Sequence, residues 1–146
     1  MNRDRKRLLL RLLLAGAGAG WAVSAIGLFL PWPVAVRWLQ DFGGAGPIPD
    51  DPMARYWLRM ASGAFAFVGA LFLACAWNPG RHSTMIPLLG ALSLFQGAVL
   101  LYFGLALRLG PMPFAADVAI CLVPGFGLLV LHRSAAAADE DRKSVV

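Results

Sequence analysis

Charged residues are scarce in this chain of 146 residues, at 14%, whereas soluble domains carry about 25%. Hydrophobic residues make up 59%, above the roughly 45–50% of soluble domains. A soluble domain of this size has too little interior to bury so much apolar surface. The composition therefore excludes an ordinary soluble domain and predicts a chain that lipid solvates.

Cysteine and histidine are also rare, with two of each. Cys75 and Cys121 lie in apolar stretches, where a thiol acts as a small hydrophobe, and their opposite depths in the expected topology disfavour a disulfide between them. His82 and His132 belong to no metal-binding motif, and axial haem ligation by the pair is a minor alternative. We therefore predict no catalytic residue, no metal site and no cofactor.

Four apolar stretches are long enough to span a bilayer, and they occupy residues 12–30, 52–77, 85–107 and 112–131. The fold class predicted is an all-α membrane protein, a four-transmembrane-helix bundle. Residues 1–133 would form its single domain, and residues 134–146 a cytoplasmic, partly disordered tail. A signal peptide cleaved after residues 23–25 is the competing interpretation of the first stretch. Apolar sequence continues beyond that site, however, which favours a retained helix.

Turn and cap signals separate these stretches. After Pro31 and Pro33, residues 34–42 have the pattern of a short interfacial helix between helices 1 and 2. Asp51 is a good N-cap for the second span, with Pro52 at its first position. Ser83 or Thr84 would cap the third span in the same way.

The basic residues predict the orientation. The net charge of +5 does not indicate nucleic acid, because most basic residues flank the apolar stretches instead of forming one exposed face. Nine of the thirteen would lie on the side of both termini, and the remaining four are Arg37, Arg55, Arg59 and Arg108. The positive-inside rule therefore predicts that both termini lie in the cytoplasm.

Small residues recur at helical spacing and predict how the spans pack. The first span carries Gly16, Gly20 and Ser24, and the third carries Gly90, Gly97 and Gly104 with Ser93. The second has a row at spacing four: Ser62, Ala66, Ala70 and Ala74. These rows predict a compact bundle of two helical hairpins, although some could serve another membrane subunit or self-association.

A few polar residues lie within the spans. Arg59 and Asp117 each lie within about the first two turns from the outer end of a span, so they would lie at similar depth. An unpaired charge there is costly, so we predict an Arg59–Asp117 ion pair, most simply as a structural clamp. Arg59 could instead reach outward to water, with Asp117 protonated or paired with Arg55 or Arg108. Gln96 would bond to another helix, and Pro124 would kink the fourth span.

Three segments of the chain resemble small bacterial four-helix membrane proteins of the BphX-like and DoxX-like kind. They are Tyr56-Trp57-Leu58-Arg59-Met60-Ala61-Ser62-Gly63-Ala64-Phe65, Ile86-Pro87-Leu88-Leu89-Gly90 and Pro113-Phe114-Ala115-Ala116-Asp117. The resemblance implies a four-helix membrane fold. It carries over no settled activity and no catalytic residue.

Three functions fit these features. The first is a non-enzymatic accessory or scaffold subunit of a bacterial inner-membrane assembly, whose partners are the bilayer and other membrane subunits. The alternative is small-molecule binding or transport through an outward-facing site near Arg59, Gln96 and Asp117, which requires a polar-lined cavity. The third is a redox protein using quinone or haem.

Overall fold

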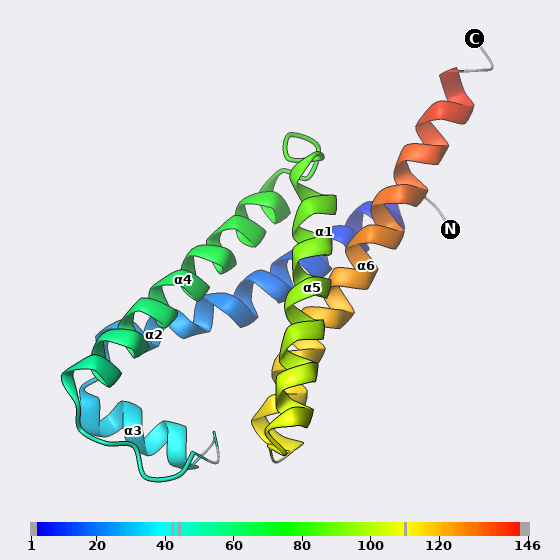
Figure 1. The fold of residues 1–146 in the computed structure, drawn as a ribbon. Coiled ribbons are helices and arrows are strands. Elements are labelled where there is room, and N and C mark those ends of the chain that lie inside the picture. Colours follow the sequence, from blue (N-terminus) through cyan, green and yellow to red (C-terminus); the bar gives the residue numbers. More distant parts are fainter. Residues whose placement is uncertain (1–2, 42, 44, 110, 144–146) are drawn as a thin grey trace.

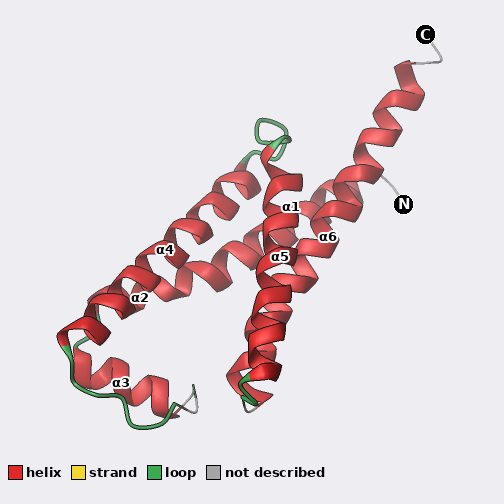
Figure 2. Cartoon of the chain, viewed as in Figure 1, coloured by secondary structure: helices red, strands yellow, loops and turns green. Residues whose placement is uncertain are grey.

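The computed structural model describes residues 3–41, 43, 45–109 and 111–143, and every regular element in these ranges is helical. In chain order the elements are α1 (Arg3–Ala22), the 3₁₀ segment η1 (Val23–Ala25), α2 (Ile26–Phe29), α3 (Trp32–Asp41), α4 (Pro52–Trp77), α5 (Met85–Ala106) and α6 (Pro111–Lys143). Figures 1 and 2 show them as long rods joined by short loops, with α3 lying across one end.

Four helical segments are long and apolar enough to cross a membrane. They are Asp4–Phe29, Pro52–Trp77, Met85–Ala106 and Phe114–Leu131. The predicted all-α architecture with four candidate spans is therefore confirmed. A short helix between the first two spans is also present as α3, which begins at Trp32 rather than at residue 34.

The ends of the helices test the cap predictions. Helix α4 has the predicted bounds, and the Asp51 carboxylate accepts a hydrogen bond from the Met53 N–H at 3.3 Å. The predicted cap on α5 is wrong, because Thr84 has helical backbone angles and its side chain makes no capping bond. A residue caps with its side chain when its own backbone is extended, as that of Asp51 is.

Helix α6 does not end near residue 131 but continues to Lys143. The run of alanines from Ala135 to Ala138 explains the continuation, because alanine has the highest helix propensity. Pro124 lies inside α6, and the helix passes through it.

The helices form two antiparallel hairpins, α1 with α4 and α5 with α6, which meet where α1 packs against α6. Helices α4 and α5 come together only near the turn at residues 78–84, and they diverge away from it (Figure 1). We call the end with this turn the closed end and the opposite end the open end. The two predicted hairpins are therefore present, but they pack into a compact bundle only at the closed end.

The hydrophobic core lies at the closed end. It combines the start of α1, the end of α4, the start of α5 and the later part of α6, through residues that include Leu14, Phe72, Ile86 and Leu128. These four side chains are almost completely buried. The open end lacks such a core among the described residues, and this is where the pockets lie.

Small residues produce the closest helix contacts, although not all at the predicted positions. In α5 the predicted residues Gly90, Ser93, Gly97 and Gly104 are all buried. A Cβ atom on Gly90 would lie 3.1 Å from the Gly125 carbonyl oxygen, so these two helix backbones cross at glycine. The α5 prediction is confirmed.

The predicted small-residue rows on the first two spans are wrong in part. In α4, Ser62 is buried but Ala70 and Ala74 are exposed, and Gly69 takes the contact with α1. A spacing of four overshoots the 3.6-residue turn by about 40° a step, so such a row winds away from any straight partner. In α1, Gly16 and Gly20 are exposed, while Ala17 and Gly18 are buried.

Candidate functional site

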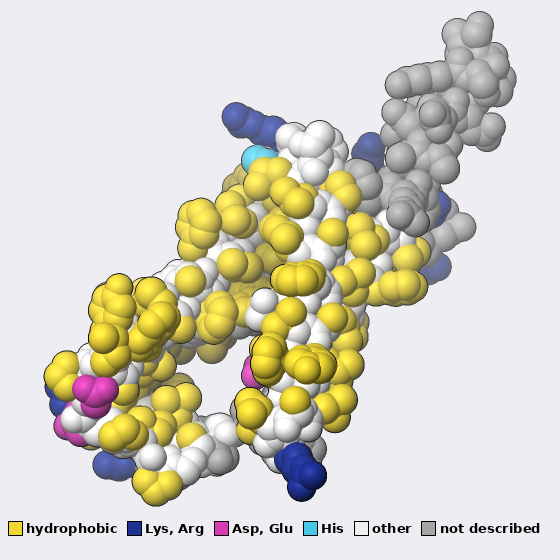
Figure 3. All heavy atoms as spheres, in the orientation of Figure 1, with side chains coloured by type: hydrophobic (Ala, Val, Ile, Leu, Met, Phe, Trp, Pro, Cys, Tyr) yellow, Lys and Arg dark blue, Asp and Glu magenta, His cyan; other side chains and the backbone are white. Residues whose placement is uncertain are grey.

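A pocket of about 190 Å³ opens between the two hairpins, where α4 and α5 diverge. All four spans contribute to its walls, with Gly20, Trp21, Ser24, Phe65, Gln96, Leu100, Asp117 and Ile120. The space-filling view in Figure 3 shows the hollow between the hairpins. The sequence predicted two of these residues, Gln96 and Asp117, as site residues.

Gln96 and Asp117 supply most of the polar character of the pocket. Gln96 is half-buried on α5, and Asp117 is exposed on α6. Neither side chain has a hydrogen-bond or ion-pair partner in the part of the chain that the structure describes. The expected bond from Gln96 to another helix is therefore not formed there. Both side chains therefore leave hydrogen-bonding groups open at the wall of the pocket.

Ser24 is the third polar side chain of the pocket, and it is already engaged. Its hydroxyl lies 2.6 Å from the Trp21 carbonyl oxygen and 3.3 Å from the Ser62 carbonyl oxygen. The shorter bond lies within the first span, and the longer one joins that span to α4. Ser24 therefore shapes the wall of the pocket instead of offering a free donor.

Two aromatic rings form one wall. The ring centroids of Trp21 and Phe65 are 5.1 Å apart, with an angle of 51° between the planes. Such a tilted pair is a favourable aromatic contact, and it holds α1 to α4 at the depth of the pocket. Its exposed ring surface faces the same space that Gln96 and Asp117 line.

The opposite wall contains Ile120, whose carbonyl oxygen lacks its usual helical hydrogen-bond donor. In a regular helix the Ile120 carbonyl would accept from the N–H of residue 124, but this residue is proline and has no N–H. Helix α6 therefore has a weakened backbone ladder beside the pocket. Pro124 is visible in the sequence, but its spacing to Ile120 predicts no pocket, because the lining depends on which helices are neighbours.

Arg59 is not part of this pocket. Its guanidinium donates hydrogen bonds to the carbonyl oxygens of Gly27 and Leu30. Leu30 precedes Pro31 and has extended backbone angles, so α2 ends here and leaves carbonyls without helical donors. Arg59 therefore caps the end of the first span from α4.

The structure does not bring Arg59 and Asp117 together, and the ion pair that the sequence predicted is absent among the described contacts. The reason is the order of the helices. Helix α4 packs on α1, and α6 packs on α1 and α5, so α4 and α6 lie diagonally across the bundle. Equal depth in the membrane therefore did not imply contact.

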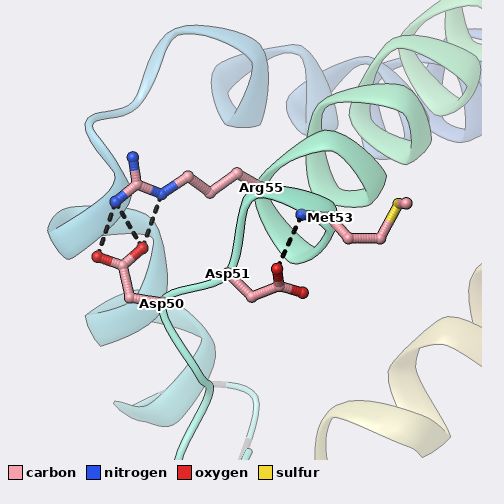
Figure 4. A network of polar contacts seen from close by, with 4 residues as sticks. All are labelled: Asp50, Asp51, Met53 and Arg55. Atoms are coloured by element: carbon pink, nitrogen blue, oxygen red, sulfur yellow. Dashed lines mark hydrogen bonds and ion pairs between the residues drawn. The ribbon is translucent and has the colours of Figure 1, made fainter.

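Arg55 is also engaged elsewhere. Its guanidinium donates two hydrogen bonds of 2.7 Å to the Asp50 carboxylate, as Figure 4 shows beside the Asp51 cap. The same group lies 5.7 Å from the ring centroid of Trp32. Both charges are exposed, so the pair contributes at most about 1 kcal/mol. This cluster holds the start of α4 near α3, and sequence spacing alone did not reveal it.

A second pocket, of about 220 Å³, lies between the end of the first span, α3 and α4. Its walls are almost entirely apolar, with side chains such as Ile26, Leu39 and Leu58, and Ser24 and Ser62 add only small polar surface. It shares Ser24 with the first pocket.

Residues that could hold a metal or a haem do not gather in the described part of the chain. No group of three or more His, Cys, Asp or Glu side chains could hold a metal ion there. Cys75 and Cys121 are buried free thiols, as the sequence predicted. His82 lies in the turn after α4, and the side chain of His132 lies outside the described residues.

Comparisons with models of protein families, with curated proteins and with solved structures each find no match for this chain. The resemblance to BphX-like and DoxX-like proteins therefore rests on the quoted segments alone.

Proposed function

We propose that this protein is a non-enzymatic, membrane-spanning bundle that binds a small molecule in the pocket between its hairpins. The observation that carries the proposal is the unpartnered pair Gln96 and Asp117 on the wall of a cavity. Polar side chains inside a span usually face a partner or a functional cavity, because lipid offers them no hydrogen bonds. A bound molecule with complementary groups would satisfy both.

The proposed placement is the inner membrane of a bacterium, with both termini in the cytoplasm. The support is the excess of Lys and Arg on the closed end and the termini. With this placement the pocket opens in the outer half of the membrane. Helix α3, whose exposed side chains include Val34 and Trp38, would lie in the outer interface.

Glycines on α1 offer a matched test of binding. Gly20 lines the pocket, and a Cβ atom there would be 3.6 Å from Ile120, whereas a Cβ atom on Gly16 would meet nothing within 4 Å. Gly20→Phe should therefore fill the pocket, and Gly16→Phe should leave it open. Native mass spectrometry of gently extracted protein should show a small-molecule adduct on the wild type and on Gly16→Phe, but not on Gly20→Phe. An adduct that survives in Gly20→Phe would refute binding at this site.

The accessory or scaffold function that the sequence favoured is the second candidate. It is supported by the separation of α4 and α5, since these consecutive helices leave an opening that a helix of another subunit could enter. In the same mass spectra this function predicts a second polypeptide bound to the protein and no small adduct. The redox alternative has no described contact in its favour.

A further inference from the structure

The pocket contains one ionisable carboxyl group and no basic side chain. Among the described residues, Asp117 is the sole charged one on its walls. Arg59 bonds instead to carbonyls of the first span, and Arg55 bonds to Asp50. A negative charge at this depth favours a positive partner, because Coulomb attraction is strong where water is scarce. The protein supplies none among its described residues.

We propose that the pocket binds the head group of a small organic cation, with the positive group between the Asp117 carboxylate and the Trp21–Phe65 wall. This inference rests on the proposed binding function and names the class of its ligand. Aromatic faces attract ammonium groups through the ring quadrupole, most strongly where water is excluded. Gln96 adds a carbonyl oxygen that can accept from an ammonium N–H.

The lining favours an organic cation over a metal ion. Metal sites in proteins need several oxygen, nitrogen or sulfur ligands around one point. Here one carboxylate and one amide face two aromatic rings and aliphatic side chains. No group of metal-ligating side chains was found in the described residues.

The size of the pocket indicates which part of the ligand it holds. At about 190 Å³ it is smaller than the roughly 300–1,000 Å³ of sites that enclose drug-sized molecules. Because α4 and α5 are apart here, a longer apolar tail can leave between them toward lipid. The ligand class is therefore an amphiphile with a compact cationic head.

Two probes of the same shape test the charge directly. Benzyltrimethylammonium is a cation, and neopentylbenzene replaces its nitrogen with carbon and is neutral. Binding of each is measured by equilibrium dialysis against the full chain in nanodiscs of phosphatidylcholine, and the signal from Gly20→Phe nanodiscs is subtracted. We compare the wild type, Asp117→Asn, and the control Asp41→Asn, which alters an exposed carboxylate on α3 outside the pocket.

The expected result is that Asp117→Asn weakens cation binding about tenfold, equivalent to about 1.4 kcal/mol, while Asp41→Asn leaves it unchanged. Binding of the neutral probe should be the same in all three proteins, which also shows that Asp117→Asn keeps the pocket. If both probes bind the wild type equally and Asp117→Asn changes neither, the charge preference is refuted and the binding function stands. If neither probe exceeds the Gly20→Phe signal, both proposals fail.

Discussion

The Arg59 side chain caps the C-terminal end of a helix that is not its own. It donates from α4 to carbonyls of Gly27 and Leu30 at the end of the first span. A hydrogen bond that involves a charged group contributes about 1.5–3 kcal/mol to the free energy of unfolding. Arg59→Met should therefore lower the unfolding free energy in detergent by about 2 kcal/mol. Arg37→Met, an exposed change on α3, should have little effect.

A double-mutant cycle separates this role from the ion pair that the sequence predicted. Since Arg59 and Asp117 share no described contact, the effects of Arg59→Met and Asp117→Asn on unfolding should add to within about 0.5 kcal/mol. Chemical denaturation of the two single variants and the double variant measures this. A coupling energy well above that value would show that Arg59 and Asp117 interact, as the sequence predicted.

Among the described residues other than glycine, Arg108 alone has a left-handed backbone conformation, with φ at 51°. It follows the end of α5, where the Leu109 N–H donates to the Gly104 carbonyl and the Arg108 N–H to the Leu105 carbonyl, the pattern of a Schellman cap. Glycine is the usual residue at such a position. Arg108→Gly should raise the unfolding free energy by about 1 kcal/mol, and thermal melts in detergent measure it. An unchanged or lower melting temperature would contradict this.

At the scale of elements, the contact between α1 and α4 depends on Gly69. A Cβ atom there would lie 2.5 Å from the Ala22 nitrogen and 2.8 Å from the Gly18 carbonyl oxygen, both backbone atoms that cannot move aside. Gly69→Ala should cost about 2 kcal/mol by overpacking. Gly16→Ala, where nothing lies within 4 Å, should be neutral or stabilising by up to about 1 kcal/mol. Equal melting temperatures for the two variants would show that α1 and α4 are not this close.

The elements were the most predictable level of this structure, and their contacts were less so. The bounds of α4 and the Asp51 cap followed from local signals, namely an N-cap residue, a proline and an apolar run. The partners of Arg59 did not, because they depend on which helices are neighbours and on where the first span ends. Gln96 and Asp117 could be predicted because they are polar residues in apolar spans. Trp21 and Phe65 could not, because in the sequence they are like any aromatic residue that packs between helices, and only the structure shows that they line the same pocket as Asp117.

At the scale of the whole molecule, the alternation of the four spans places both ends of the described chain on the side of the 78–84 turn. In a background with Cys75→Ala and Cys121→Ala, Ser83→Cys should react with a membrane-impermeant maleimide only after the cells are opened. Gly46→Cys, in the loop before α4, should react in intact cells whose outer membrane is permeable to the reagent. The reverse pattern would invert the proposed orientation and place the pocket in the inner leaflet.

The short segment η1 determines how far α2, the rest of the first span, is rotated about the helix axis relative to α1. A 3₁₀ helix advances about 120° per residue and an α-helix about 100°, so the three residues Val23–Ala25 turn α2 about 60° beyond a continuous α-helix. This offset helps to aim the last carbonyls of the span at Arg59. One alanine inserted after Ala25 would leave the segment apolar and long enough to span a membrane. It would, however, rotate those carbonyls by roughly a quarter turn away from the Arg59 guanidinium.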